Sequence, residues 1–375
     1  MSGPSDRLLR LRPSGIRRFT ALAKSTPGCC QLTIGEPDFD TPEPIKAAAV
    51  QALAAGATHY APNRGTERLC NAISEFETRR GFPCRARQIL VTPGATGALY
   101  TALTGILNPG DQVIIPTPAF SLYESITLAA GGEPVFLELN KTGFQIDEAA
   151  LEHAVTPKTR AIVINSPCNP TGCVLSPGSL DAVERCAQTH DLWIICDNVY
   201  MALARPDTPD ISLRGSLRER LIFCQSFSKP YAMTGWRIGY LIAPEALCDR
   251  LLLLQAAQLA AVPTFIQAAA ETALKTDVSG MCRSFATRRE YVCRRLGDMG
   301  LDFPMPEGAF YVFPEIRKFG LGSEAFCLEM IRRAGLAAVP GTSFGCEGHI
   351  RISCCYSQPQ LEEGLNRLEQ FIHTF

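Results

Sequence analysis

The chain has 375 residues, a length typical of two domains, and 46% of them are hydrophobic, which is enough to build substantial cores. Its formal net charge of −1 gives no electrostatic attraction to nucleic acid or to an anionic membrane, so we expect neither as a partner. We expect no signal peptide, because residues 1–18 are basic and lack a long apolar segment. Residues 251–274 are the most apolar long stretch, but glutamines and a proline interrupt them, so we predict a buried or interface helix.

The sixteen cysteines form no C-x-x-C pair, and the five histidines do not group with them. Metal sites and redox motifs need such groupings, so we predict no metal site. The pattern instead predicts reduced, mostly buried thiols in a cytosolic protein.

Residues 1–40 are predicted to form an N-terminal arm that ends in a turn-rich active-site loop. Helices are expected at 44–55 and 67–80, and apolar runs then alternate with helical stretches. This alternation predicts a mostly parallel sheet with both faces covered. The expected strands are residues 89–91, 113–115, 134–139, 161–164, 193–196, 221–224 and 238–243.

Beyond residue 280 the pattern changes to α+β, with helices and short strands mixed. We therefore expect a large domain at 41–280 and a smaller domain at 281–375. The helices expected in the smaller domain are 284–298, 322–334 and 359–374, and its strands are 310–313, 336–339 and 349–355.

One lysine, two serines and an arginine stand between two expected strands, in residues 225–237. Burial lowers the pKa of a lysine and leaves a free amine for covalent chemistry, which would suit Lys229. Ser226 and Arg237 could clamp a phosphate through hydroxyl and guanidinium donors. On this segment alone, a surface hairpin whose charges serve solubility explains the pattern about equally well.

Polar or small residues also follow four other expected strands, where open parallel sheets bind ligands. A helix N-terminus beginning near Ala95 and Thr96 could seat an anion. Asp197 ends an apolar strand, where an unpaired acid is costly. Ordinary turns, a helix cap and a core phenylalanine are the structural alternatives for these residues. The remaining candidates at this edge are Phe120, Asn169 and Tyr200.

The pattern S-x-S-K-x(7)-R, with Gly235 and Trp236 before its arginine, resembles that of the class I/II aminotransferases. So does the motif N-x-P-x-N-P-T-G at residues 165–172, and the resemblance covers roughly residues 30–355. Members of this family are pyridoxal phosphate (PLP) enzymes of fold type I. The resemblance implies an α/β fold with a mostly parallel sheet of about seven strands in a large PLP-binding domain, and a smaller α+β C-terminal domain.

The resemblance also implies a role for each polar group. Lys229 would bind PLP covalently and act as the catalytic base, and Asp197 would pair with the protonated pyridine nitrogen. Tyr200 and Asn169 would bond the phenolic oxygen of the cofactor, and Phe120 would stack on its ring. The residues implied at the phosphate are Ala95, Thr96, Ser226, Arg237 and Tyr60 of the partner subunit, so that a homodimer would share its active sites.

Arg351 stands inside an apolar strand and needs a counter-charge, which a structural ion pair could supply. The family pattern R-[IL]-S implies instead that Arg351 binds the substrate α-carboxylate bidentately, with contacts from Asn169 and the backbone of Gly35. Asn198 stands where the family usually has an acid, a departure that should leave the chemistry intact. No second arginine can be placed opposite Arg351, so the amino donor stays open.

The combined pattern predicts a transaminase that exchanges an amino group between an L-amino acid and a 2-oxo acid, with 2-oxoglutarate as the expected acceptor. A C–S lyase of the same fold is an alternative, because side-chain contacts alone choose the fate of the shared carbanion. A PLP-sensing regulatory domain is a further alternative, although this N-terminal segment is too short for the DNA-binding module of such regulators. A nicotinamide enzyme is disfavoured, because no G-x-G-x-x-G follows any strand.

Overall fold

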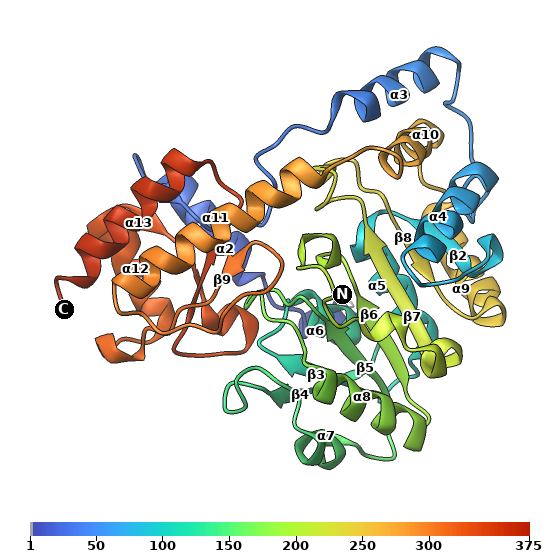
Figure 1. Cartoon of the computed structure of the whole chain (residues 1–375). Helices are drawn as coiled ribbons and strands as arrows, with labels where there is room; N and C mark the ends of the chain where they lie inside the picture. Colours follow the sequence, from blue (N-terminus) through green and yellow to red (C-terminus); the bar gives the residue numbers. More distant parts are fainter. Residues whose placement is uncertain (1–2) are drawn as a thin grey trace.

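The computed structural model describes residues 3–375, and a sheet of seven strands lies at its centre (Figure 1). The strands are β2 (Ile89–Thr92), β3 (Gln112–Thr117), β4 (Glu133–Glu138), β5 (Thr159–Asn165), β6 (Trp193–Asp197), β7 (Leu221–Ser226) and β8 (Gly239–Ile242). Their order is β2-β8-β7-β6-β5-β3-β4, and β8 runs antiparallel to both of its neighbours, β2 and β7, whereas all other neighbouring pairs are parallel. All seven expected strands are present, and the prediction of a mostly parallel sheet is confirmed.

Both faces of this sheet are buried, since successive side chains of a strand point to opposite sides. In β5, Ile162 and Ile164 enter one hydrophobic core, while Ala161 and Val163 enter the other. The helices over the first face are α4 (Glu67–Arg79), α7 (Glu148–Ala154), α8 (Pro177–Thr189) and α10 (Thr264–Ala273); those over the second are α5 (Gly94–Ile106), α6 (Leu122–Ala129) and α9 (Glu245–Leu259).

Several helices differ from expectation. Residues 251–274 are not one helix: α9 ends at Leu259, Ala260 has a positive φ of 62°, and Pro263 caps α10. The short helix α7 was not predicted. Within residues 3–375, no helix is both long and apolar enough to cross a membrane.

The C-terminal part forms a second body with the expected α+β arrangement. Its helices are α11 (Ser279–Asp298), α12 (Ser323–Ala334) and α13 (Gln358–Ile372), and its antiparallel sheet has the order β11 (Val339–Pro340), β12 (Ile350–Ser353) and β9 (Tyr311–Val312). Figure 1 shows α11 running between this body and the central sheet.

The N-terminal segment contributes regular structure that the sequence did not predict. Besides the one-turn helix α1 (Asp6–Leu9), it forms α2 (Gly15–Ser25) and β1 (Cys30–Gln31). β1 pairs in parallel with β10 (Leu336–Ala337), and Phe19 of α2 is buried in the same core as the C-terminal helices. As predicted, the chain is irregular after Ile34, where it enters the loop that reaches the site.

The sixteen cysteines are all free and all but four are buried, as the sequence predicted. Glu152, Cys186 and His190 bring three potential metal-ligand atoms within 4.8 Å of one another. The ring Nε2 of His190 lies 2.7 Å from a carboxylate oxygen of Glu152, and burial with the nearby Glu152 raises the pKa of the Cys186 thiol to about 12. The group is therefore explained as a hydrogen-bonded surface pair next to a protonated thiol.

Candidate active site

A cavity of about 220 Å³ lies where the parallel strands of the central sheet end at their carboxyl edge. It opens into a wider cleft bordered by residues 12–18 and by Glu36 and Glu124. Every site residue predicted from the sequence lines this cavity except Tyr60. Those that line it are Gly35, Ala95, Thr96, Phe120, Asn169, Asp197, Tyr200, Ser226, Lys229, Arg237 and Arg351.

Lys229 stands on the loop between β7 and β8 and points into the cavity. Its Nζ donates a 2.7 Å hydrogen bond to the backbone carbonyl of Gly35 and lies 5.8 Å from the centre of the Phe310 ring. Burial is the main cause that lowers the pKa of Lys229, and the positive charges of Arg351 and Arg237 lower it further. Loss of a proton from this amine is therefore easier than for a lysine in water, as a nucleophile or general base requires.

One end of the cavity is built to receive an anion. Gly94 opens α5 with a positive φ of 74°, and a Cβ there would stand 3.0 Å from the Arg237 guanidinium group, so only glycine lets the two approach. Arg237 itself holds a positive φ of 55°, a conformation that costs a non-glycine residue energy. Ser226 and Ser228 add hydroxyls that lie 2.8 Å apart. With the free N–H groups of the first turn of α5, these donors can hold a phosphate.

Asp197 is a buried carboxylate, 4% exposed, at the end of β6. The hydroxyl of Tyr123 donates a 2.7 Å hydrogen bond to its Oδ2, and the N–H of Val199 donates a 3.4 Å bond to its Oδ1. Burial raises the pKa of Asp197 to about 6, although both hydrogen bonds and the charge of Lys229 lower it. Neither direct partner is a cation, so the carboxylate keeps its charge available for a positively charged ligand group.

Two asparagines connect the ends of β5 and β6 with Arg351. The amide nitrogen of Asn165 donates a 2.9 Å hydrogen bond to the carbonyl of Asp197, and its Oδ1 accepts a 2.9 Å bond from the N–H of Asn169. The Oδ1 of Asn169 then accepts a 2.8 Å bond from Nη1 of Arg351. The loop of the N-x-P-x-N-P-T-G motif is thereby fixed against both the acid and the arginine.

Arg351 is 1% exposed and lies between the rings of Tyr311 and Phe344, with its guanidinium carbon 4.4 and 4.9 Å from their centres. Its hydrogen-bond acceptors are the amide oxygen of Asn169 and the carbonyl of Thr33, and its Nε lies buried without a partner in the part of the chain that the structure describes. The alternative of a structural ion pair is therefore not realised within residues 3–375. A guanidinium group in this setting suits a carboxylate ligand.

The cavity also holds polar residues to which the sequence assigned no role. Ser228 belongs to the motif S-x-S-K-x(7)-R and Asn165 to N-x-P-x-N-P-T-G, so their place in these motifs could have identified them as site residues. Tyr123 also lines the cavity, where its hydroxyl donates a hydrogen bond to Asp197. Tyr311 meets Tyr200 through a 3.0 Å contact between hydroxyl oxygens, and no local pattern indicates this pair.

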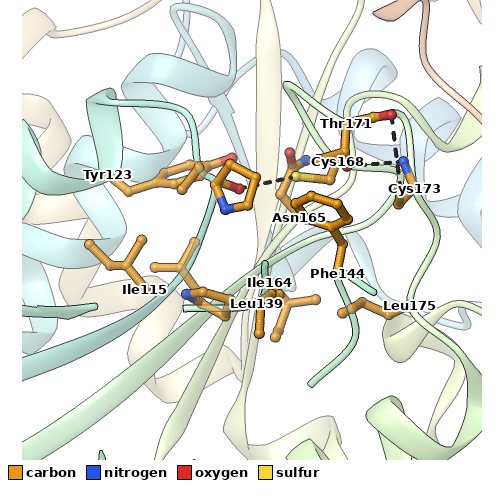
Figure 2. Close-up of a pocket in the computed structure, with 14 residues that line it drawn as sticks. Ile115, Tyr123, Leu139, Phe144, Ile164, Asn165, Cys168, Thr171, Cys173 and Leu175 are labelled. Atoms are coloured by element: carbon orange, nitrogen blue, oxygen red, sulfur yellow. Dashed lines mark hydrogen bonds between the residues drawn. The ribbon is translucent and has the colours of Figure 1, made fainter. Parts of the chain in front are cut away.

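A second, mostly apolar cavity adjoins the first, and Tyr123 and Asn165 line both (Figure 2). The thiol of Cys168 in its wall donates a 3.5 Å hydrogen bond to the carbonyl of Pro118. Burial raises the pKa of Cys168 to about 11 and that of Cys173 to about 12. Both thiols are therefore protonated near neutral pH and are poor nucleophiles. The residues of this cavity support the active site by packing against it and supply no reacting group.

Tyr60 is the one predicted site residue that lies outside the cavity. It is 93% exposed, on the segment that follows α3 (Glu43–Ala54). Figure 1 shows α3 at the outer edge of the molecule beside α10, where it makes its main contacts. Within a single chain, Tyr60 thus contributes nothing to the site.

Comparison with known proteins agrees with this geometry. Residues 27–368 match the family described as "Aminotransferase class I and II". The chain is 41% identical to the aromatic-amino-acid aminotransferase 2 of Thermococcus litoralis and 40% identical to an aspartate aminotransferase of Pyrococcus abyssi, in each case over 98% of both chains. Its structure matches aspartate aminotransferase from Thermus thermophilus with maleate at a TM-score of 0.93 and 33% identity, covering 99% of this chain and 100% of that one.

These similarities extend over nearly the whole chain and over the complete fold. They confirm the fold type I architecture predicted from the sequence and favour amino-group transfer over C–S bond cleavage. The chain is an aminotransferase and belongs to the class I and II aminotransferase family.

Proposed function

We propose that the cavity binds PLP and that the enzyme moves an amino group between an L-amino acid and a 2-oxo acid in two half-reactions. The observation that carries this proposal is the meeting, in one cavity, of a buried amine, a buried carboxylate and an anion cradle. These groups are Lys229, Asp197 and the donors around Arg237. The expected acceptor is 2-oxoglutarate.

The residues present fit PLP at three points. The cradle around Gly94 and Arg237 matches a phosphate group. Asp197 has no cation in direct contact and can pair with a protonated pyridine nitrogen. Tyr200 offers a hydroxyl for the phenolic oxygen, and Phe120 in the cavity wall offers a ring face for stacking.

When bound, PLP supplies an electron sink for the electron pair that remains when the substrate loses its Cα proton. Lys229 removes this proton as general base, a role that its lowered pKa supports. Asp197 keeps a proton on the pyridine nitrogen. Arg351 binds the substrate α-carboxylate, and Asn169 holds the guanidinium group in place. Before the cofactor binds, the carbonyl of Gly35 accepts a hydrogen bond from the lysine amine and holds it in the cavity.

We also propose that two copies of the chain form a homodimer with shared active sites. Apolar side chains on and after α3 are exposed: Val50 by 64%, Leu53 by 45% and Tyr60 by 93%. Burial of these groups against a second copy would remove apolar area from water and favour association. In that arrangement Tyr60 of the partner subunit would reach the phosphate end of the cavity.

Spectroscopy of the PLP-loaded protein tests the function. Single amino acids should move the visible absorption band of the bound cofactor to shorter wavelength, and a 2-oxo acid should reverse the change. Lys229→Ala should lose turnover and this reversible change, whereas Lys141→Ala, an exposed lysine outside the cavity, should behave as wild type. Normal turnover in Lys229→Ala would contradict the mechanism, and release of ammonia with a persistent band would indicate the lyase.

A further inference from the structure

Tyr311 lies deep in the cavity wall, where it contacts three of the groups described above. Its hydroxyl oxygen is 3.0 Å from that of Tyr200, and its ring lies beneath the guanidinium group of Arg351. A Cβ at Gly35 would stand 1.7 Å from the Tyr311 hydroxyl oxygen. Position 35 must therefore be glycine for this hydroxyl to stay where it is.

We propose that Tyr311 is a positioning residue whose hydroxyl donates to the oxygen of Tyr200 and so directs the proton of Tyr200 toward the cofactor ring. This inference rests on the proposed function, in which Tyr200 bonds the phenolic oxygen of PLP. Each hydroxyl carries one proton, so whichever tyrosine accepts from the other keeps its own proton for a third group.

The surroundings decide which tyrosine is the donor. Within the described residues, neither hydroxyl has another hydrogen-bond partner. A hydrogen bond to a negatively charged oxygen is about twice as strong as one between neutral groups, so the proton of Tyr200 goes to the ring oxygen. The positive charge of Arg351 over the Tyr311 ring makes that hydroxyl a better donor to Tyr200. The bond from Tyr311 to Tyr200 and the bond from Tyr200 to the ring oxygen polarise each other, so each strengthens the other.

This arrangement has a measurable consequence in the resting enzyme. With PLP bound, the nitrogen of Lys229 would share a proton with the ring oxygen of the cofactor, and a hydroxyl donor at that oxygen would lower the affinity for this proton. Loss of the Tyr311 hydroxyl should therefore raise the pH midpoint of the cofactor absorbance change. The other titratable or charged groups around the two tyrosines include Arg351, Asp197, Tyr123, Cys355 and Tyr356.

A double-mutant cycle on the PLP-loaded protein without substrate tests the proposal. Tyr311→Phe keeps the ring under Arg351 and should raise the midpoint by about 0.3 to 1 pH unit, the equivalent of one net hydrogen bond. Tyr200→Phe should raise it more. Adding Tyr311→Phe to Tyr200→Phe should cause no further shift, because Tyr311 acts through Tyr200.

An unchanged midpoint in Tyr311→Phe would overturn the proposal, as would a shift of equal size in the Tyr200→Phe background. Tyr356→Phe is the matched control, since that hydroxyl lies nearby but accepts from the N–H of Ile34 at 3.0 Å; it should leave the midpoint unchanged. If Tyr311→Phe does not fold, Gly35→Ala should displace the hydroxyl and shift the midpoint in the same direction. A wild-type protein that shows no cofactor band would instead refute the proposed function.

Discussion

The hydroxyl of Tyr123 donates a 2.7 Å hydrogen bond to Oδ2 of Asp197, and both side chains are buried. The carboxylate stands at the end of an apolar strand, where loss of water raises its pKa to about 6. The bond from Tyr123 acts in the opposite direction by stabilising the charged form. Tyr123 thus controls how much of Asp197 is ionised near neutral pH.

Tyr123→Phe should therefore raise the pKa of Asp197 and weaken PLP binding near pH 7. A hydrogen bond to a charged group contributes about 1.5 to 3 kcal/mol, so the ionised fraction of Asp197 at pH 7 should fall and the dissociation constant should rise by about two- to fifteenfold. The difference from wild type should shrink as pH rises, because the carboxylate then ionises in both proteins. Titration of the apoprotein with PLP between pH 5.5 and 8.5 measures both effects.

Tyr240→Phe is the matched control for that experiment. Tyr240 also donates its hydroxyl proton to a buried carboxylate, that of Glu77, but neither residue lines the cavity. This variant should lose stability and keep the PLP affinity of wild type. Equal PLP affinity of Tyr123→Phe and wild type at every pH would show that Tyr123 does not tune Asp197.

Asp197→Asn should stabilise the apoprotein in a pH-dependent way. The pKa of Asp197 is raised from 3.8 to about 6, so the folded chain holds this proton more tightly than the unfolded chain. The favourable contribution is present below pH 3.8 and is lost as pH rises through 6. At about 1.4 kcal/mol per pH unit, the variant should gain at most about 3 kcal/mol over wild type above pH 6.

Urea unfolding of both apoproteins at pH 5 and pH 8 checks this prediction. The stability advantage of Asp197→Asn should be larger at pH 8, while the PLP-loaded variant should lose most of its transaminase activity. An advantage that is equal at both pH values would mean that burial does not raise the pKa of Asp197.

Much of the fold follows from sequence because strands buried on both faces are continuous apolar runs. β5 and β7 illustrate this, since residues 161–164 of β5 and all of β7 are buried. Helix ends are harder to predict. The break after Leu259 depends on a positive φ at Ala260, which nothing in that alanine-rich segment signals. α2 is held by its contacts with the C-terminal body, which lie far away in sequence.

The residues of the candidate site also fall into those that the sequence predicts and those that it does not. Residues that follow strand ends, such as Lys229 and Asp197, are predictable because parallel strands deliver them to one edge. Contacts between distant residues are not: Tyr123 is 74 positions from Asp197, and Tyr200 is 111 positions from Tyr311. Only the folded chain shows which hydroxyl meets which group.

Arg351→Lys should raise KM for both the amino acid and the 2-oxo acid. An ammonium group cannot offer two parallel N–H donors to a carboxylate, and the bond to Asn169 would be lost as well. Loss of about 2 to 4 kcal/mol of binding predicts a fall of about 30- to 1000-fold in kcat/KM. Steady-state kinetics with both substrates measures this change, and PLP affinity should stay near that of wild type.

Arg367→Lys provides a matched control, because Arg367 also bonds backbone carbonyls, those of Gly28 and Gly335, but stands outside the cavity. It should leave KM unchanged. If Arg351→Lys raised KM no more than this control does, the substrate carboxylate would have to bind elsewhere.

If two chains share their active sites as proposed, Tyr60→Phe should weaken PLP binding without dissociating the dimer. The hydroxyl of the partner's Tyr60 is expected to bond the cofactor phosphate, a charge-assisted bond whose loss should raise the PLP dissociation constant by about tenfold or more. Val50→Asp should act differently, because it places a charge on the exposed apolar face of α3 and should favour the monomer.

Sedimentation velocity and PLP titration of the same samples separate these effects. Tyr291→Phe is the control for Tyr60→Phe, since that tyrosine lies on α11 and accepts a hydrogen bond from Arg295. Loss of PLP affinity in Tyr60→Phe, with an unchanged dimer, would support a site that two chains complete. A monomeric protein with full activity would show instead that each chain works alone, and Tyr60 would then have no part in the site.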